Sequence, residues 1–214
     1  MNLRKMFLLF MILPLLFVFT SCTEEESIVE PSINEAEVLV QHLESTGDYL
    51  NTLLPAIMDV QAVRDLQLVN PAKLHIIDIR LATDFTARGR IEGAVNVQLK
   101  DLLAHMKTIN PASFDRIAIV CYSGQTSGYA TAMLRLLGHA NVFSVKFGMS
   151  AWNSEVANSW NPNIGNNFTN FVTTNFPKPA AGSLPNLNTG KKTGREILEA
   201  RIDQLLASDR KSVV

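Results

Sequence analysis

The sequence predicts an α/β fold with a central, mostly parallel sheet flanked by helices. Short apolar runs that fit buried strands alternate with segments of helical periodicity, which is the pattern of a parallel sheet. The 214 residues and the 47% hydrophobic content are enough for one ordinary domain with a core, plus extensions. The formal charge is −1, so the chain lacks the excess of basic residues that is typical of nucleic-acid-binding proteins, and we expect no nucleic-acid partner.

Each element follows from a local pattern. Ser32 to Glu35 fits a capping box that opens the first helix. Ala130 and Leu134 lie on the apolar face of a later helix, which Gly138 is expected to stop. The expected helices cover residues 32–45, 60–66, 99–106 and 130–137, and the expected strands cover residues 74–79, 93–97, 117–120 and 142–145.

The composition changes after residue 160. Residues 161–192 are rich in Asn, Pro, Thr and Gly, which predicts a linker or irregular wrap, with its phenylalanines anchoring part of it to the core. Thr193 to Glu196 then fits a second capping box, at the start of a helix within residues 193–214. This helix weakly repeats the first one, and residues 209–214 resemble the translation of a sequencing adapter. We therefore expect the start of a second, similar domain of a longer protein, with a chance repeat as the alternative.

The first 21 residues have the pattern of a secretory signal. Arg4 and Lys5 precede an apolar run over residues 6–19, which is short for a membrane span. The run ends in Phe19-Thr20-Ser21-Cys22, which resembles a bacterial lipobox, although Phe19 stands where leucine is usual. Cleavage before Cys22 would leave that residue lipidated. We therefore expect a lipid anchor in a membrane and a location in the bacterial cell envelope, at the periplasmic face or the outer surface.

The most informative segment joins the strand over residues 117–120 to the next helix. Cys121 ends this strand, and ligands of parallel sheets bind beyond such carboxyl ends. The loop amides and the first helical turn direct partial positive charge at the sulfur, which favours the nucleophilic thiolate. The alternative is that Cys121 is a small buried core residue. The polar residues of the loop, which suit a ligand cradle, are Tyr122, Ser123, Gly124, Gln125, Thr126 and Ser127.

Cysteine usage adds a further expectation. Cys22 and Cys121 are the 2 cysteines of the chain. If Cys22 carries lipid, Cys121 has no disulfide partner within the chain. An unpaired thiol outside the cytoplasm is prone to oxidation unless it has a chemical task or a protein that keeps it reduced. We therefore expect either a chemical task for Cys121 or a redox partner protein that keeps it reduced.

Four segments in this order resemble the rhodanese-homology family, whose members are sulfurtransferases. They are Ile77-Asp78-Ile79-Arg80, Asp84-Phe85 with residues 89–96, residues 121–127, and residues 147–152. The resemblance implies a rhodanese-like domain at 48–160. The patterns described above give the rest of the organisation: a lipoprotein signal peptide at 1–21, an acidic tether and helix at 22–47, an irregular linker at 161–192 and a final helix at 193–214, the possible start of a truncated second domain.

The resemblance also implies a mechanism. Cys121 would take sulfane sulfur from a persulfide, polysulfide or thiosulfate donor and hold it as a persulfide cradled by the loop amides. It would then pass the sulfur to a thiol or to cyanide. Asp78 and Arg80 would support the site by pairing with each other and bracing the loops, while Asn96 and Trp152 would be architectural. The mechanism requires no cofactor and no metal.

The loop departs from the family in one respect. Many members that use thiosulfate carry arginine or lysine there, whereas Tyr122, Gln125 and Thr126 are neutral. Hydrogen bonds to charged donors are about twice as strong as neutral ones, so a dianionic donor loses its best partner. A persulfide or polysulfide donor is therefore easier to accommodate than thiosulfate.

Other functions fit less well. A Cys-x5-Arg phosphatase loop needs arginine six residues after the cysteine, where this chain has Ser127. A cysteine hydrolase needs a histidine base, and His42, His75, His105 and His139 have no diagnostic spacing to Cys121. The rival from another class is a rhodanese-like binding or sensing module that presents the thiol, or its persulfide, to a partner without catalysis.

Overall fold

The computed structural model describes residues 33–52, 54–159, 161–165, 168 and 170–208. The expected signal segment, Cys22 and the last six residues lie outside this set. The helices are α1 (Glu35–Ser45), α2 (Tyr49–Thr52), α3 (Val60–Val69), α4 (Ala82–Ala87), α5 (Leu102–Thr108), α6 (Gln125–Leu136), α7 (Gly148–Trp152) and α8 (Gly194–Ala207). The strands are β1 (Ile57–Met58), β2 (Leu74–Asp78), β3 (Val95–Asn96), β4 (Arg116–Val120) and β5 (Val142–Val145), with short 3-10 turns between several elements.

The five strands form one parallel sheet in the order β1-β5-β4-β2-β3. The predicted α/β class with a mostly parallel central sheet is therefore confirmed. The edge strand β1 was not predicted, because its two residues are too few to show a periodic pattern. In the centre, Ile77 pairs with Ile119 and Asp78 with Val120, so β2 and β4 end side by side.

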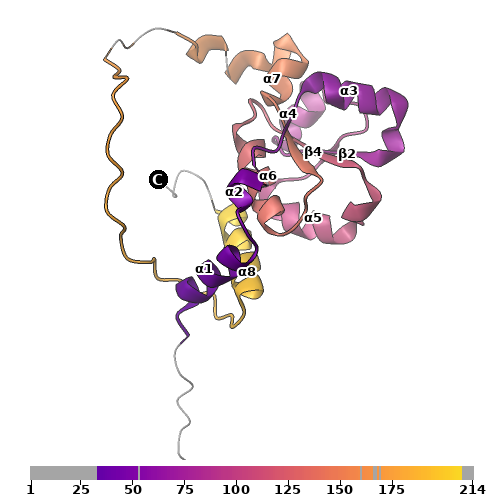
Figure 1. Cartoon of the computed structure of the whole chain (residues 1–214). Helices are drawn as coiled ribbons and strands as arrows, with labels where there is room; N and C mark the ends of the chain where they lie inside the picture. Colours follow the sequence, from indigo (N-terminus) through magenta and orange to yellow (C-terminus); the bar gives the residue numbers. More distant parts are fainter. Residues whose placement is uncertain (1–32, 53, 160, 166–167, 169, 209–214) are drawn as a thin grey trace, which may run out of the picture. The chain divides into compact units, whose positions relative to one another are not determined.

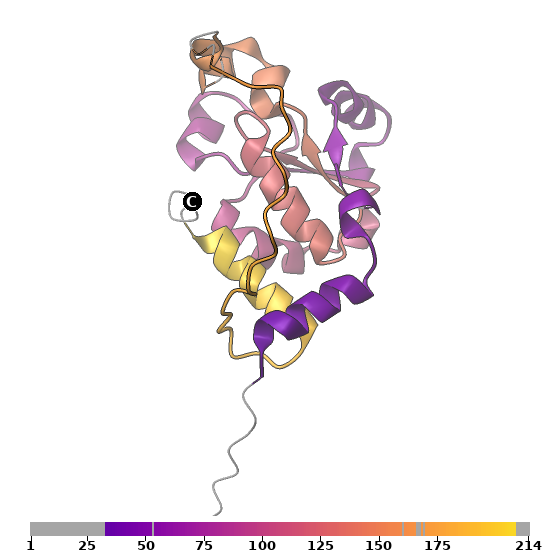
Figure 2. The ribbon, with the colours of Figure 1, turned by 60° about the vertical axis from the view of Figure 1, so that its left-hand side comes forward.

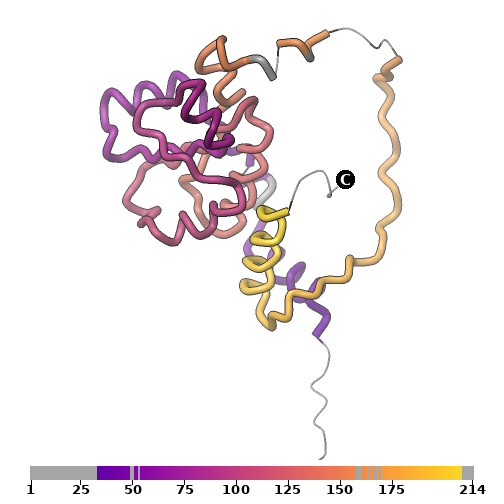
Figure 3. The backbone as a smooth tube through the Cα atoms, turned by 180° about the vertical axis from the view of Figure 1, so that it is seen from behind, coloured from indigo at the N-terminus to yellow at the C-terminus, as the bar shows by residue number. Residues whose placement is uncertain are grey.

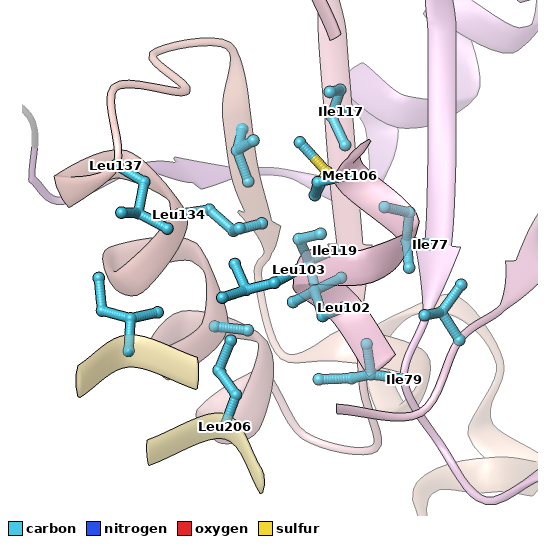
Figure 4. Close-up of a cluster of buried hydrophobic side chains, with 14 of the residues drawn as sticks. Ile77, Ile79, Leu102, Leu103, Met106, Ile117, Ile119, Leu134, Leu137 and Leu206 are labelled. Atoms are coloured by element: carbon cyan, nitrogen blue, oxygen red, sulfur yellow. The ribbon is translucent and has the colours of Figure 1, made fainter. Parts of the chain in front are cut away.

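Alternate residues of the central strands face two apolar layers, as the pleat of a strand requires. Ile77 and Ile119 belong to the layer that includes α5, α6 and α8, which Figure 4 shows in close-up. Ile76 and Val120 belong to the layer that includes Val63 of α3. Figure 1 accordingly shows α3 and α5 on opposite sides of the strands. Covering both faces explains why the strands are continuous apolar runs.

The terminal helices pack together and against this core. Figure 2 shows α8 beside α1, and Ile202 of α8 is 1% exposed within the same apolar layer as the sheet. The capping box predicted at Thr193 and Glu196 is present. The capping box predicted at Ser32 begins outside the described residues, and the N-cap of α1 is Asn34, two residues later, which accepts a hydrogen bond from the amide of Glu37.

The buried carboxylate of Glu35 connects the two ends of the described chain. It accepts hydrogen bonds from the amide and hydroxyl of Thr189 at 2.6 and 2.7 Å and from the amide of Gly190 at 2.7 Å. These bonds, that from the Thr189 amide first, lower the pKa of Glu35. The carboxylate thus fixes the segment before α8 against the start of α1.

The predicted linker is extended and largely exposed. Figure 3 shows residues 170–193, which follow the 3-10 turn at Asn161–Asn163 and precede α8, as a long path without regular structure. The expected anchoring of its phenylalanines is wrong: Phe168, Phe171 and Phe176 are 82%, 77% and 81% exposed. Within the described part of the chain, none of the helices combines the length and apolarity needed to cross a bilayer.

Candidate active site around Cys121

Cys121 lies where β4 ends and the loop to α6 begins. The carboxyl ends of the parallel strands lie at this end of the sheet, and ligands of such sheets bind there. The residue is 3% exposed and belongs to an apolar layer on its strand side. Burial alone therefore does not decide whether Cys121 is a core residue or a site residue. The polar contacts of its sulfur distinguish these two interpretations.

Two backbone amides donate hydrogen bonds to the Cys121 Sγ. The Gly124 amide is 3.1 Å away and the Ser127 amide is 3.4 Å away. The Ser127 hydroxyl oxygen is also 3.4 Å from the sulfur. Gly124 is the N-cap of α6, so the sulfur lies at the positive end of that helix. Amide donors and a helix N-terminus stabilise an anion, which favours a thiolate or a terminal persulfide at this position.

The loop depends on close packing against the start of α7. The amides of Met149 and Ser150 donate to the carbonyls of Cys121 and Tyr122, at 2.8 and 3.0 Å. Because a trans peptide directs its N–H opposite to its C=O, the amides of Tyr122 and Ser123 point away from α7. A Cβ on Gly148 would lie 2.3 Å from the Cys121 carbonyl oxygen, so only glycine fits there without displacement.

A buried hydroxyl pair lies beneath the sulfur. Ser127 is 0% exposed and Ser144, on β5, is 4% exposed. Their Oγ atoms are 2.8 Å apart, and the Ser127 hydroxyl is also 3.1 Å from the Gly124 carbonyl oxygen. A hydroxyl has one proton to donate, so a donation from Ser144 to Ser127 leaves the Ser127 proton free to turn towards a negatively charged sulfur.

Tyr122 contributes its backbone to the loop and directs its side chain elsewhere. The phenol donates to Asp84 and accepts a hydrogen bond from the Leu81 amide at 3.3 Å. Burial raises the pKa of Tyr122, and the hydrogen bond to Asp84 raises it further. The neutral phenol therefore connects the Cys121 loop to the segment after β2, and it does not line the sulfur.

Asp78 and Arg80 form a buried ion pair beside the loop. Each is 1% exposed, and the Arg80 Nη2 lies 2.7 Å from Asp78 Oδ2. The Arg80 guanidinium also donates to the Gly89 carbonyl, and the Asn96 amide donates to the carbonyls of Asp78 and Arg80 at 2.9 Å. The Arg80 carbon Cζ lies 5.9 Å from the centre of the Tyr122 ring. This network holds together the ends of β2 and β3.

The remaining predicted loop residues differ in exposure. Gln125 is exposed, while Ser123 and Thr126 are half-buried. Ser123, Gly124 and Gln125 line a pocket of about 400 Å³ beside the loop. The other residues that line it were not predicted from the sequence as site residues, and they are Ile57, Gly128, Ser144, Val145, Lys146 and Phe147.

Some of these missed residues carried a detectable signal. Ser144 is a polar residue within a four-residue apolar strand, which is unusual unless its hydroxyl has a partner. Ile57 gave none, because its place beside the loop follows from the pairing of β1 with β5, and Lys146 gave none, because its place follows from the pairing of β5 with β4. Lys146 extends the pairing of β1 with β5, since its amide donates to the Met58 carbonyl at 2.9 Å.

The histidines lie away from the sulfur. His75 is the second residue of β2, towards the opposite edge of the sheet, and its Nε2 lies 2.9 Å from the Nε2 of His105. Burial lowers the pKa of His75, His105 and His139. Among the described residues, no group of three or more His, Cys, Asp or Glu side chains is arranged to hold a metal ion.

Comparison with known proteins is consistent with this arrangement. Residues 62–155 match the family described as Rhodanese-like domain. The thiosulfate sulfurtransferase GlpE of Shewanella oneidensis is 36% identical over 89 residues, which cover 41% of this chain and 84% of that protein. The thiosulfate sulfurtransferase PspE of Escherichia coli K12 is 29% identical over 68 residues, which cover 32% of this chain and 64% of that protein.

A solved structure of a rhodanese-like domain protein from Staphylococcus aureus is 21% identical, with a TM-score of 0.39, and the match covers 45% of this chain and 90% of that chain. The family match covers β2 to β5 and the Cys121 loop, and the match to the Shewanella oneidensis protein covers 84% of that protein. The chain therefore belongs to the rhodanese-like domain family.

Proposed function

We propose that this protein is a sulfurtransferase that carries sulfane sulfur as a persulfide on Cys121. The observation that carries the proposal is the pair of amide hydrogen bonds to the sulfur, from Gly124 at 3.1 Å and Ser127 at 3.4 Å. A sulfur that was only a core atom would not need anion-stabilising donors. Two relatives that are thiosulfate sulfurtransferases support the same reaction class.

The reaction has two displacements. The Cys121 thiolate attacks the outer sulfur of the donor, the S–S bond of the donor breaks, and the leaving group departs with the electron pair. A thiolate or cyanide acceptor then attacks the outer sulfur of the persulfide, and Cys121 leaves as the thiolate. Both steps redistribute negative charge over sulfur, which the amides of the loop and the N-terminus of α6 stabilise.

The buried pair of Asp78 and Arg80 supports this site by position. The pair fixes the end of β2, and Tyr122 links that end to the Cys121 loop through Asp84 and Leu81. We assign Asp78 and Arg80 a positioning role, because the Arg80 charge is already matched by a carboxylate at 2.7 Å.

Turnover of sulfur from donor to cyanide tests this function. Purified protein lacking the signal segment should produce thiocyanate from cyanide and a sulfane donor. The Cys121→Ser variant preserves a hydrogen-bonding atom in the cradle and should fold like the wild type by circular dichroism, yet produce thiocyanate only at the uncatalysed rate. Equal turnover by the wild type and the variant would refute the role of Cys121.

We also propose that the protein is anchored in the bacterial cell envelope by lipid on Cys22. The support is the sequence of the signal segment, with Arg4 and Lys5 ahead of an apolar run that ends at Cys22. Globomycin, which blocks lipoprotein signal peptidase, should cause the unprocessed form to accumulate in expressing cells. Unaltered processing, or processing that persists in a Cys22→Ala variant, would contradict the anchor.

A further inference from the structure

The pocket beside the Cys121 loop has features that the sulfur chemistry alone does not require. Its volume is about 400 Å³, and Ser123, Gly124 and Gln125 of the loop line it. Ile57 and Phe147 also line it, and these two large apolar residues are 56% and 47% exposed. Exposed apolar residues around a concave space are a common feature of ligand sites.

Phe147 has an unusual backbone. Its φ is +57°, the left-handed region, and it is the one residue other than glycine with positive φ among the described residues. A bulky side chain in this region is strained, and such strain persists where the surrounding structure or the function requires it. The following Gly148 cannot move freely, because it packs directly on the Cys121 carbonyl. The strained residue is thus held at a fixed position relative to the sulfur.

The pocket also contains one cationic side chain. Lys146 lines it, with its ammonium 3.4 Å from the Asp59 carboxylate and 5.7 Å from the centre of the Phe147 ring. The Lys146 and Asp59 side chains are 50% and 68% exposed, so solvent weakens their attraction. An anion in the pocket can therefore compete for Lys146. The Cys121 loop itself is neutral, and this lysine supplies a positive charge from the neighbouring strand end.

We infer that this pocket, defined by Ile57, Lys146 and Phe147, selects an anionic sulfane donor that carries an apolar organic group. Ile57 and Phe147 contact the organic group, and Lys146 attracts the charge on the donor. An inorganic donor has no group for the apolar walls. The inference rests on the proposed function and names the substrate class that the site prefers.

The reaction step is balanced for such a donor. With a thiosulfonate, the Cys121 thiolate attacks the terminal sulfur, the bond between that sulfur and the sulfonyl sulfur breaks, and the sulfinate leaves with the electron pair. The products are the Cys121 persulfide anion and the sulfinate anion, so charge and electrons are conserved without an added oxidant or reductant.

Two thiosulfonates of equal charge test the apolar walls. Reduced protein is mixed with benzenethiosulfonate or methanethiosulfonate, and the rate of sulfur addition to Cys121 is read by mass. Each rate is divided by the rate of the same donor with free glutathione, which removes intrinsic reactivity. The corrected benzene-to-methane ratio should be about tenfold or more in the wild type, as expected for apolar groups in a fitting pocket.

Two substitutions should abolish this preference. Phe147→Asn removes the ring and retains a residue that tolerates positive φ, and Ile57→Thr preserves β-branching on the edge strand. Each should lower the corrected ratio to within about threefold of one, with circular dichroism confirming the fold. A wild-type ratio near one, or a high ratio that both folded variants retain, would overturn the inference while leaving sulfur transfer intact.

Lys146→Gln tests the charge. It should slow both thiosulfonates by about two- to fivefold and flatten the dependence of the rate on salt, as for an exposed ion pair. The matched control is Lys73→Gln, which lies before β2 at the opposite edge of the sheet and should leave both rates unchanged. Equal rates for the Lys146 and Lys73 variants would show that Lys146 does not attract the donor. Failure of every donor to load a folded wild type would instead refute the proposed function.

Discussion

Two glycines set the position of the Cys121 sulfur within its loop. Gly124 adopts φ +90° and turns the chain into α6, and its amide is then 3.1 Å from the sulfur. Gly148 adopts φ +55° and lies against the Cys121 carbonyl. Both conformations are costly for other residues, and the space at Gly148 is smaller than a methyl group requires. The chemistry of the loop thus depends on a residue in a different segment of the chain.

We predict that Gly148→Ala lowers the free energy of unfolding by about 2–4 kcal/mol, through overpacking and strain at positive φ. Sulfur transfer should fall as well, because the Cys121 carbonyl must move. Gly182→Ala is the control, since a Cβ there meets nothing within 4 Å and its φ is not in the left-handed region. Urea denaturation of both variants measures the effect, and equal stability of the two would contradict it.

Ser144 is expected to act through Ser127. Ser144→Ala removes the 2.8 Å contact between the hydroxyls, so the Ser127 oxygen loses the donor that leaves its own proton available to the sulfur, and the buried strand loses a hydrogen bond. We predict a loss of about 1 kcal/mol in stability. The rate of sulfur loading should fall several-fold, because the Ser127 hydroxyl is no longer oriented towards the sulfur. An unchanged loading rate in the folded variant would show that Ser144 is structural only, and Ser144→Thr should restore part of the wild-type rate.

At the scale of elements, α8 is part of the same core as the sheet. Leu198, Ile202 and Leu206 are 4%, 1% and 2% exposed and lie in the apolar layer that also contains Leu134 of α6. The Glu35 carboxylate fixes the chain just before this helix. These contacts account for α8 without a second domain. Whether a further domain follows in a longer protein stays a prediction of the sequence.

We predict that Ile202→Ala destabilises the protein by about 2–5 kcal/mol, as expected for a truncated core residue that leaves a cavity. Gln204→Ala, an exposed position on the same helix, should change stability by less than about 0.5 kcal/mol. Thermal and urea unfolding compare the two variants. Similar small effects would mean that α8 does not belong to the core.

Local patterns predicted most elements because their signals are contained within each segment. The apolar run before Cys121 and the capping box at Thr193 needed no tertiary information. The exposed phenylalanines of the linker show the limit of this reasoning, since hydrophobicity alone does not supply a surface to pack against. The edge strand at Ile57 and Met58 was missed because it is defined only by its pairing with β5.

The same distinction applies to the candidate site. Cys121, its loop and the pair of Asp78 and Arg80 occur in contiguous motifs, so the sequence could indicate them. Ser144 and Lys146 reach the site only because β5 lies next to β4 in the sheet. The direction of a side chain could not be predicted from the sequence either. The Tyr122 side chain, for example, donates a hydrogen bond to Asp84.

At the scale of the whole molecule, a pair of histidines at the end of the sheet opposite Cys121 makes stability depend on pH. The Cys121 loop follows the carboxyl edge, while His75 and His105 meet towards the other edge and stack with their rings 5.2 Å apart. Their Nε2 atoms share a single hydrogen bond at 2.9 Å, which cannot form once both rings are doubly protonated. Burial, the main cause, lowers the pKa of both rings in the fold from the usual 6.5.

The sign of the pH effect follows from these lowered values. Below about pH 6.5 the unfolded chain binds protons that the folded protein does not, so the free energy of unfolding decreases as the pH falls from that point. The contribution of the neutral histidine pair to the free energy of unfolding is fully present above about pH 6.5. We predict lower stability at pH 5.5 than at pH 7.5, measured by urea unfolding. In His105→Phe, which preserves a ring beside His75, this loss should be smaller. An equal loss in the variant would exclude the histidine pair as its source.

The central claim is that Cys121 carries sulfur, and the mass of the intact protein tests it most directly. Reduced protein is treated separately with thiosulfate, polysulfide and glutathione persulfide, and Cys121→Ser is treated in parallel. The account predicts a gain of one sulfur atom in the wild type, its removal by cyanide, and no gain in the variant. A folded wild type that gains no sulfur from any donor would contradict the account and favour a binding or sensing module.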